Sequence, residues 1–353
     1  MVASPDRPWF VPRVRWHDAS VTDVLLLLLS FPLLLGGAVL FTNAVEWLGR
    51  ALRLGQSAVG SILAAGGTAL PESLIPAVAI VGGSHGSGDV AIGAIVGAPF
   101  LLATIALALV ACSAFLFRAR RPHGAGVGAD LTTFRRDLLA FAVFFVVAIA
   151  LGVGAPFPLR IAGAFALVAG YAVYVVRTLR ASAGVEEEHA LAPLYADTSR
   201  HDPPNRLQIV GQLALGLALI VVGAHLFVDE VLNVAESIGL APLVLSLVLA
   251  PFATELPEKA NSFLWMRQGK DTLALGNVTG AMVFQSTLPV AIGLASTDWD
   301  LGGASLLAAG LALAGALLAW FVIGRRRRFG PLPILVWAGL YAAFVVFVAA
   351  GGG

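Results

Sequence analysis

Charge, cysteine and nucleotide-binding motifs are all scarce in this sequence, and each scarcity excludes a class of protein. Only 12% of the 353 residues are charged, about half of the roughly 25% found in soluble domains. A single cysteine, Cys112, excludes an internal disulfide framework and any metal site built on cysteines. There is no Gly-x-x-x-x-Gly-Lys-Ser/Thr loop, so we expect no nucleotide partner. The net charge of +1 indicates no partner of either sign, and no nucleic-acid partner is expected.

Long apolar runs are what the sequence has in abundance, since 58% of its residues are hydrophobic. A transmembrane helix needs about 20 predominantly apolar residues, whereas a membrane barrel would show alternating segments of about 10 residues. The pattern predicts an all-α, polytopic membrane protein with a lipid bilayer as its surroundings. We expect ten spans, at 22–48, 56–82, 89–117, 137–155, 158–178, 207–236, 241–267, 271–297, 301–323 and 331–350.

The polar linkers divide the chain into two halves and suggest its orientation. Residues 1–182 and 207–353 each contain five spans, and 183–206 form a polar linker between them. Most lysines and arginines fall on the side of that linker, and the opposite side has Arg7, Arg13, Arg15 and Arg160. Because basic loops stay in the cytoplasm, we expect a multi-pass cell-membrane protein with a cytoplasmic linker and both termini outside.

One short motif occurs twice, once in each half. The first copy is Gly66-Gly67-Thr68-Ala69-Leu70-Pro71-Glu72, and the second is Ala253-Thr254-Glu255-Leu256-Pro257-Glu258. The two copies lie in spans two and seven. An offset of five spans makes the second copy cross the membrane in the opposite direction, as in the inverted repeats of many secondary transporters. We therefore expect two inverted five-helix repeats whose motifs meet near the membrane midplane.

Both copies offer the same set of oxygen atoms. A carboxylate deep in a span is costly and faces a cavity or a partner. A hydroxyl lies four residues earlier on the same helix face, and the proline leaves the carbonyl four residues before it without a helical donor. Such oxygens suit Ca²⁺, Na⁺ or a proton relay. The candidate cation-binding residues are Glu72, Thr68 and Gly67 in the first copy, and Glu258, Thr254 and Ala253 in the second.

The span that follows each motif has a face of small residues. Gly93 and Gly97 form a Gly-x-x-x-Gly pair in the first half, and Gly276 and Gly280 form one in the second. Such pairs let a neighbouring helix approach closely. We expect the two glycine faces to pack against helices that carry the motifs.

These residues resemble the α-repeats of the cation/Ca²⁺ exchanger superfamily, of the sodium/calcium exchanger type. In that family Gly-Thr-Ser-x-Pro-Glu is followed on the next helix by Gly-Asn-x-x-Gly-Ser-Asn or -Asp. The counterparts here span 44–107 and 246–293, with Asn277 matching the asparagine of the second motif. The resemblance implies alternating-access antiport of a divalent cation against Na⁺ or H⁺, with Glu72 and Glu258 as central metal ligands. It implies no enzyme activity and no cofactor other than the transported ions.

The chain also departs from the family pattern. Ala69, Ala98 and Ala281 stand where the family has serines, which removes oxygens expected to bind Na⁺ and favours proton coupling. Glu255 replaces a further serine and is a candidate ligand. It lies four residues before Lys259, a spacing that permits an ion pair. Lys259 either neutralises Glu255 structurally, or its ammonium approaches Glu258 or Glu72, occupies a cation subsite there and so modulates the site.

Other polar residues in or beside the spans are weaker candidates. Asn277 and Gln285 lie on span eight and are possible site residues. Asp89 and Asp271 begin spans three and eight, and we expect them to cap those helices.

Two alternative functions remain open from the sequence. The lost serines and asparagines would suit a scaffold of the same fold that no longer transports. Gly86-Ser87-Gly88-Asp89 matches the Gly-x-Gly-Asp of intramembrane aspartyl proteases, but the Tyr-Asp of that family does not occur in the sequence. Glutamates that face each other would favour transport over the scaffold.

Overall fold

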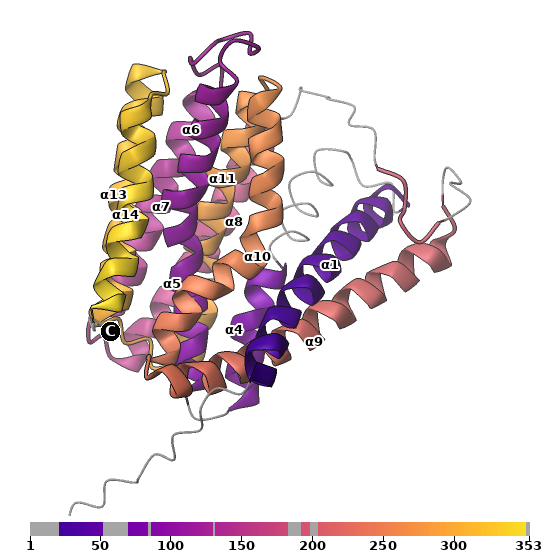
Figure 1. Cartoon of the computed structure of the whole chain (residues 1–353), viewed down its shortest axis with the longest axis vertical. Coiled ribbons are helices and arrows are strands. Elements are labelled where there is room, and N and C mark those ends of the chain that lie inside the picture. Colours follow the sequence, from indigo (N-terminus) through magenta and orange to yellow (C-terminus); the bar gives the residue numbers. More distant parts are fainter. Residues whose placement is uncertain are drawn as a thin grey trace, which may run out of the picture.

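Helices make up nearly all of the computed structural model, which describes residues 21–51, 70–83, 86–129, 131–182, 192–197 and 204–350 (Figure 1). The first half contains α1 (Val21–Ala51), α4 (Leu70–Gly82), α5 (Ser87–Leu101), the π-helical turn η2 (Leu102–Ala106), α6 (Leu107–Leu116), α7 (Leu131–Leu151) and α8 (Phe157–Ser182). The second contains α9 (Arg206–Ile238), α10 (Pro242–Arg267), α11 (Asp271–Gln285), α12 (Leu288–Ser296), α13 (Gly303–Phe321), the π-helical turn η3 (Val322–Arg326) and α14 (Pro331–Ala349).

These helices fall on the ten predicted spans. α5, η2 and α6 run on as one span, as do α13 and η3, while α11 and α12 share another. Among the described residues, seven stretches are long and apolar enough to cross a membrane, and shorter apolar helices cover Glu72–Gly82 and Pro242–Glu255. The predicted start of span two, at 56–69, lies outside the described residues. The expectation of an all-α membrane protein is confirmed.

The two halves are arranged as inverted repeats. Helix α4 contacts α5 as α10 contacts α11, and α7 contacts α11 as α13 contacts α5. The contact of α8 with α12 likewise has its counterpart in that of α14 with α6. Exchanging the halves therefore reproduces these three contacts, as expected for inverted five-helix repeats related by a two-fold axis.

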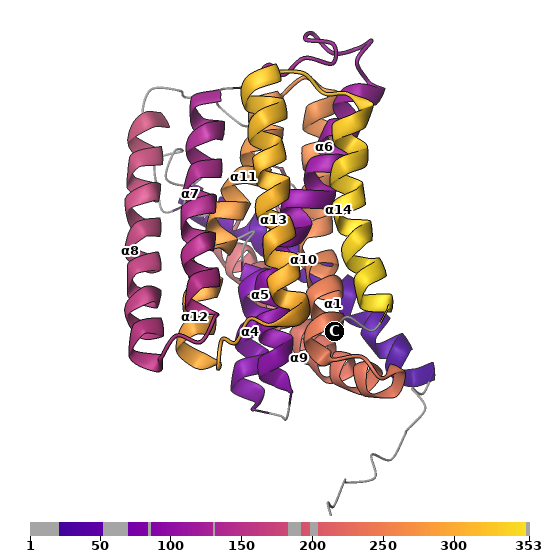
Figure 2. The same cartoon turned by 90° about the vertical axis from the view of Figure 1, so that its left-hand side faces the viewer.

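Helices α1 and α9 lie side by side at an angle to the other helices (Figure 1), which stand roughly upright beside one another (Figure 2). Small residues let the two backbones meet. A Cβ atom on Gly37 would lie 2.9 Å from the carbonyl oxygen of Gly216, and one on Gly216 would lie 2.7 Å from the amide nitrogen of Phe41. This close approach is typical of small-residue contacts between membrane helices.

A piece of the predicted linker is docked where α1 and α9 meet. Asn43 of α1 donates from Nδ2 to the Pro193 carbonyl at 3.3 Å, and Gln212 of α9 accepts from the Ala196 amide at 2.7 Å. The Gln212 amide also donates to Asn43 Oδ1 at 2.9 Å. We call Ala192–Asp197 the docked segment.

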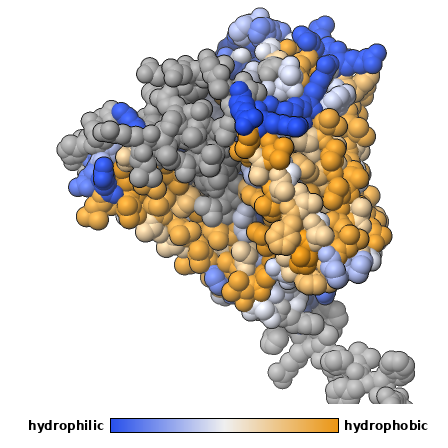
Figure 3. Space-filling model, turned by 180° about the vertical axis from the view of Figure 1, so that it is seen from behind, coloured by the Kyte–Doolittle hydropathy of each residue, from blue (hydrophilic) through white to orange (hydrophobic). Residues whose placement is uncertain are grey.

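The exterior of the bundle is apolar and its interior is packed with large side chains. Leu317, Leu332 and Val346 are 67–69% exposed, and hydrophobic residues cover the flank of the molecule below a hydrophilic end (Figure 3). An apolar flank suits contact with lipid tails, because helices satisfy their own backbone hydrogen bonds there. The fully buried aromatic side chains include Phe100, Phe141, Trp299 and Trp337.

Asp271 does not cap its helix, contrary to expectation. Helix α11 has no side-chain cap, and Asp271 is instead buried in an ion pair with Arg121, whose Nη2 atom donates to both carboxylate oxygens, at 2.6 and 2.7 Å. The amide of Gly128 donates to the same carboxylate at 2.7 Å. The start of α5 also has no side-chain cap, so Asp89 does not play that role either. Asp271 therefore pairs with a residue distant in sequence and does not cap its own helix.

Candidate functional site

Glu72 lies in the first turn of α4 and its side chain is 7% exposed. Pro76 follows four residues later and has no N–H to donate to the Glu72 carbonyl. The first motif thus places a carboxylate near the start of a short helix inside the bundle. Its partners Gly67 and Thr68 lie outside the described residues.

The second motif lies in the middle of α10. Ala253, Thr254 and Glu255 are all buried there, at 0%, 5% and 0% exposed. The Thr254 hydroxyl donates to the Ala250 carbonyl at 3.1 Å, so it is held against its own helix. Pro257 cannot donate to the Ala253 carbonyl. The backbone of Glu258 is helical, while its side chain lies outside the described residues.

Gln285, the last residue of α11, joins the two halves at this site. Its Nε2 atom donates to Glu72 Oε2 at 2.7 Å and to Glu255 Oε1 at 3.2 Å. All three side chains are buried, Gln285 at 1% exposed. Carboxylates from the two inverted repeats therefore meet on one amide group.

Lys259 forms the ion pair that its spacing predicts. Its Nζ atom lies 3.1 Å from Glu255 Oε2, and both side chains are buried. The two oxygens of Glu255 thus have different neighbours, the ammonium of Lys259 on one side and the amide of Gln285 on the other.

Asn277 is directed to a neighbouring hydroxyl. It donates from Nδ2 to the Ser262 hydroxyl at 2.8 Å, which joins α11 to α10. Ser262 is fully buried and was not singled out in the sequence. Its position, four residues after Glu258 on the same helix face, is the signal that would have found it.

Asp137 is a further buried carboxylate, and it was not among the predicted site residues. It is 2% exposed in α7 and accepts hydrogen bonds from Tyr174 of α8 and Thr279 of α11, both at 2.9 Å. The bonds fasten α11 to the outer helices from the side away from Ser262. Helix α11 is therefore anchored on both sides.

The two glycine faces differ in the described residues that surround them. Cβ atoms on Gly93 and Gly97 would overlap the carbonyl oxygens of Leu243 and Leu247, so α5 and α10 touch through their backbones. This contact is the one that the first Gly-x-x-x-Gly predicts. Gly276 and Gly280 have no described atom within 4 Å of the corresponding positions. The predicted contact of the second face is absent from the described part of the chain.

The described side chains hold no group of three or more histidine, cysteine or acidic residues close enough for a metal ion. Among the described side chains, Gln285 joins Glu72 to Glu255, and the side chain of Glu258 lies outside the described residues. The arrangement offers two carboxylates and one amide for hard cations.

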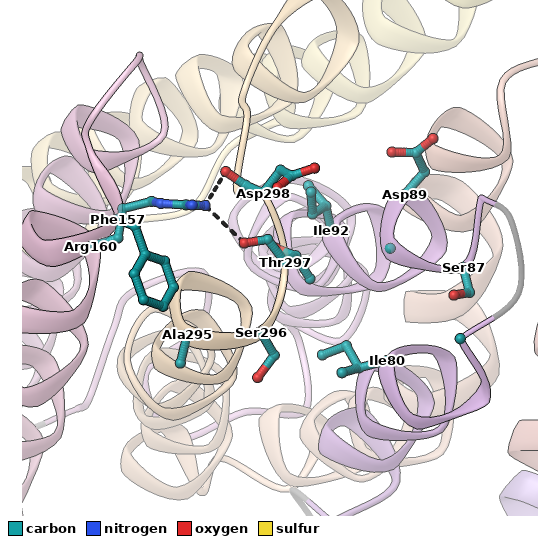
Figure 4. Close-up of a pocket in the computed structure, with 12 residues that line it drawn as sticks. Ile80, Ser87, Asp89, Ile92, Phe157, Arg160, Ala295, Ser296, Thr297 and Asp298 are labelled. Carbon is teal, nitrogen blue, oxygen red and sulfur yellow. Dashed lines mark hydrogen bonds between the residues drawn. The ribbon is translucent and has the colours of Figure 1, made fainter.

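A separate cavity of about 440 Å³ lies at the end of the bundle where α4 ends and α5 begins. Arg160 and Phe157 of α8 lie on one side of it, Ser87 and Asp89 on the other, with Thr297 between them (Figure 4). Arg160 donates to the carbonyl oxygens of Thr297, at 2.8 Å, and Asp298. The described residues that line this cavity include none of the candidate cation-binding residues.

Comparisons with known proteins agree with this geometry. A 331-residue alignment relates the chain, at 25% identity, to a protein of Alkalimonas amylolytica named "Putative antiporter CaxA", covering 86% of this chain and 91% of that protein. A solved H⁺/Ca²⁺ exchanger, CAX, has the same fold with a TM-score of 0.69 at 20% identity, over 94% of this chain and 82% of that one. The sodium-calcium exchanger NCX_Mj has a TM-score of 0.57 at 19% identity, over 93% and 98%.

The family model described as "Sodium/calcium exchanger protein" matches residues 22–180 and 208–350. The two matched segments include the described parts of both motifs and all the helices that carry them. This chain therefore belongs to the sodium/calcium exchanger protein family.

Proposed function

We propose that this chain is a secondary active antiporter that exchanges Ca²⁺, or another hard cation, for H⁺ or Na⁺ at a midplane site built on Glu72 and Glu258. The observation that carries the proposal is the convergence of Glu72 and Glu255 on the amide of Gln285. Buried carboxylates at membrane depth are expensive and mark ion pathways. Helices of opposite direction bring these two together.

The chemistry of the site suits a hard cation. Carboxylate and amide oxygens are the ligands that Ca²⁺ prefers. Rotation of the Gln285 amide about its terminal torsion, which is a soft one, would turn Oε1 toward the two carboxylates in place of Nε2. We propose that an arriving cation causes this rotation, so that Gln285 changes from a donor to Glu72 into a ligand of the cation.

The missing hydroxyls favour H⁺ as the coupling ion. Ala69, Ala98 and Ala281 remove three oxygens that the family pattern offers to Na⁺. Carboxylates remain, and a carboxylate releases a metal when it takes up a proton. Both a solved H⁺/Ca²⁺ exchanger and a solved sodium-calcium exchanger share this fold, so the choice of H⁺ rests on the missing hydroxyls.

We further propose that both chain termini lie outside the cell membrane, because the lysines and arginines gather on the opposite side. The basic loop that contains Arg118 and Arg120 would then face the cytoplasm, together with the docked segment. Accessibility of single cysteines introduced at Ala119 and at Gly154, in a background with Cys112 replaced, would test the orientation.

The proposal is tested by uptake of labelled Ca²⁺ into proteoliposomes under an imposed H⁺ gradient and, separately, an imposed Na⁺ gradient. We expect uptake to follow the H⁺ gradient and to stop when the gradient is dissipated. Liposomes that contain Glu72→Gln protein are the matched control. Uptake under neither gradient, from protein that elutes as a folded species, would contradict the proposal and support a scaffold that has lost transport.

A further inference from the structure

The ion pair between Glu255 and Lys259 is unusual in its surroundings. Both side chains are at most 2% exposed, and 3.1 Å separates Nζ from Oε2. Taking two charges out of water is costly, and replacing a buried ion pair by apolar residues is often neutral or stabilising. Stability alone therefore does not account for the presence of both charges in the middle of α10.

The pair lies next to the proposed transport site. Glu255 offers Oε2 to the ammonium of Lys259 and Oε1 to the amide of Gln285, which also binds Glu72. A single carboxylate group thus separates the ammonium from the amide that joins the two repeats. At this separation in a poorly solvated interior, the charge of Lys259 acts strongly on any ion held by Glu72.

The two motif copies differ at these two positions. Aligned on Thr68 and Thr254, the first copy has Ala69 and Ser73 where the second has Glu255 and Lys259. The second copy therefore carries one additional negative and one additional positive charge. Their sum is zero, so the net charge of the site is set by Glu72 and Glu258. The two negative charges of these carboxylates balance one divalent cation.

We propose that the ammonium of Lys259 is a tethered cation, which permanently occupies a position beside Glu255 where a monovalent cation would otherwise bind. The exchanger would then carry one mobile ion fewer than its carboxylates could bind. This inference rests on the proposed function. An ammonium has the charge of Na⁺ and three donors for oxygen ligands. Its four-carbon stem is anchored in α10, one helical turn from the carboxylate that it serves.

Replacing Lys259 would leave the position beside Glu255 open to a mobile monovalent cation. We would measure Ca²⁺ binding to Lys259→Met protein in detergent, where no ion gradient exists, with and without added ammonium or Na⁺. The expected result is stimulation by about tenfold or more, the change in affinity that about 1.4 kcal/mol gives. Wild-type protein should show no stimulation. The double variant Glu255→Gln/Lys259→Met, which lacks both the carboxylate and the ammonium, should also bind Ca²⁺ without stimulation.

The outcome that would overturn the inference is a Lys259→Met protein that no monovalent cation stimulates, or equal stimulation of the single and double variants. A purely structural pair predicts recovery in the double variant but no stimulation in the single one. Should Lys259→Met fail to fold, Glu255→Gln provides a second measurement. This variant leaves the ammonium without its carboxylate, and its affinity for Ca²⁺ should be lower than that of the double variant by about tenfold or more. Equal affinities would also overturn the inference.

Failure of the proposed function gives a different result from failure of this inference. If wild-type protein moves no Ca²⁺ under either gradient, the antiport proposal is wrong. If wild-type protein exchanges Ca²⁺ and monovalent cations leave Lys259→Met unchanged, only the tethered cation is wrong.

Discussion

Glu72 accepts a hydrogen bond from the side-chain amide of Gln285 at 2.7 Å, although 213 residues separate them in the chain. The bond joins the first turn of α4 to the last residue of α11, and so connects the two inverted repeats inside the bundle. Because Glu255 accepts from the same nitrogen, any ion that enters between the two carboxylates must rearrange this amide.

The first prediction concerns the two motif glutamates. Glu72→Gln and Glu258→Gln each remove a negative charge that we propose to balance the transported cation, while they preserve side-chain volume. We expect cation-driven exchange in proteoliposomes to fall to the level of empty liposomes, with unchanged elution on a sizing column. Full exchange by both variants would show that the site lies elsewhere.

The second prediction concerns Gln285. Gln285→Leu removes both the donor to Glu72 and the oxygen that we propose to turn toward the cation. A hydrogen bond to a charged group contributes about 1.5–3 kcal/mol, so the concentration of Ca²⁺ at half-maximal uptake should rise by about tenfold or more. Gln268→Leu is the matched control, because Gln268 is exposed at the end of α10. If the two variants reached half-maximal uptake at the same Ca²⁺ concentration, Gln285 would not be part of the site.

The Gly-x-x-x-Gly pairs show which part of a helix contact can be predicted from the sequence. Small residues four apart indicate a close helix contact, and α5 meets α10 at Gly93 and Gly97 as that pattern predicts. The partner of a helix face is not encoded in the spacing itself. The second face, Gly276 and Gly280, meets no described atom within 4 Å although its pattern is the same.

The third prediction uses this difference. Gly97→Ala places a methyl group against the Leu247 carbonyl, where it must push α5 from α10, and overpacking of this kind costs about 1–3 kcal/mol. We expect a lower midpoint of thermal unfolding in detergent. Gly276→Ala should leave the midpoint unchanged or raise it, because alanine is the better helix former. A Gly97→Ala protein as stable as the wild type would contradict the contact.

The side-chain contacts between residues far apart in the sequence are the part of the site that could not be predicted. Glu255 and Lys259 lie four residues apart, and their ion pair follows from helical geometry. Asp271 was expected to cap a helix because capping is a local interaction. Its partner Arg121 lies 150 residues away, and nothing in the local sequence identifies it. The bridge from Gln285 to Glu72 was missed for the same reason, although Gln285 itself was a candidate.

The fourth prediction concerns the ion pair of Arg121 and Asp271. Arg121→Met leaves a buried carboxylate with no arginine, and breaking a buried pair costs about 3–5 kcal/mol. The midpoint of thermal unfolding should fall clearly, and Arg121→Met/Asp271→Leu should recover most of the loss because neither charge remains. Arg120→Met, at an exposed position one residue earlier, is the control. If Arg121→Met and Arg120→Met unfold at the same temperature, the pair contributes little.

The docked segment has a consequence for how the crossing helices α1 and α9 move. Asn43 and Gln212 each bind the backbone of Ala192–Asp197 and also bind one another. One helix cannot slide along the other at this end without breaking several of these bonds at once. The peptide that connects the two repeats in sequence thus fastens these two helices to each other, and we infer that any movement of α1 would carry α9 with it.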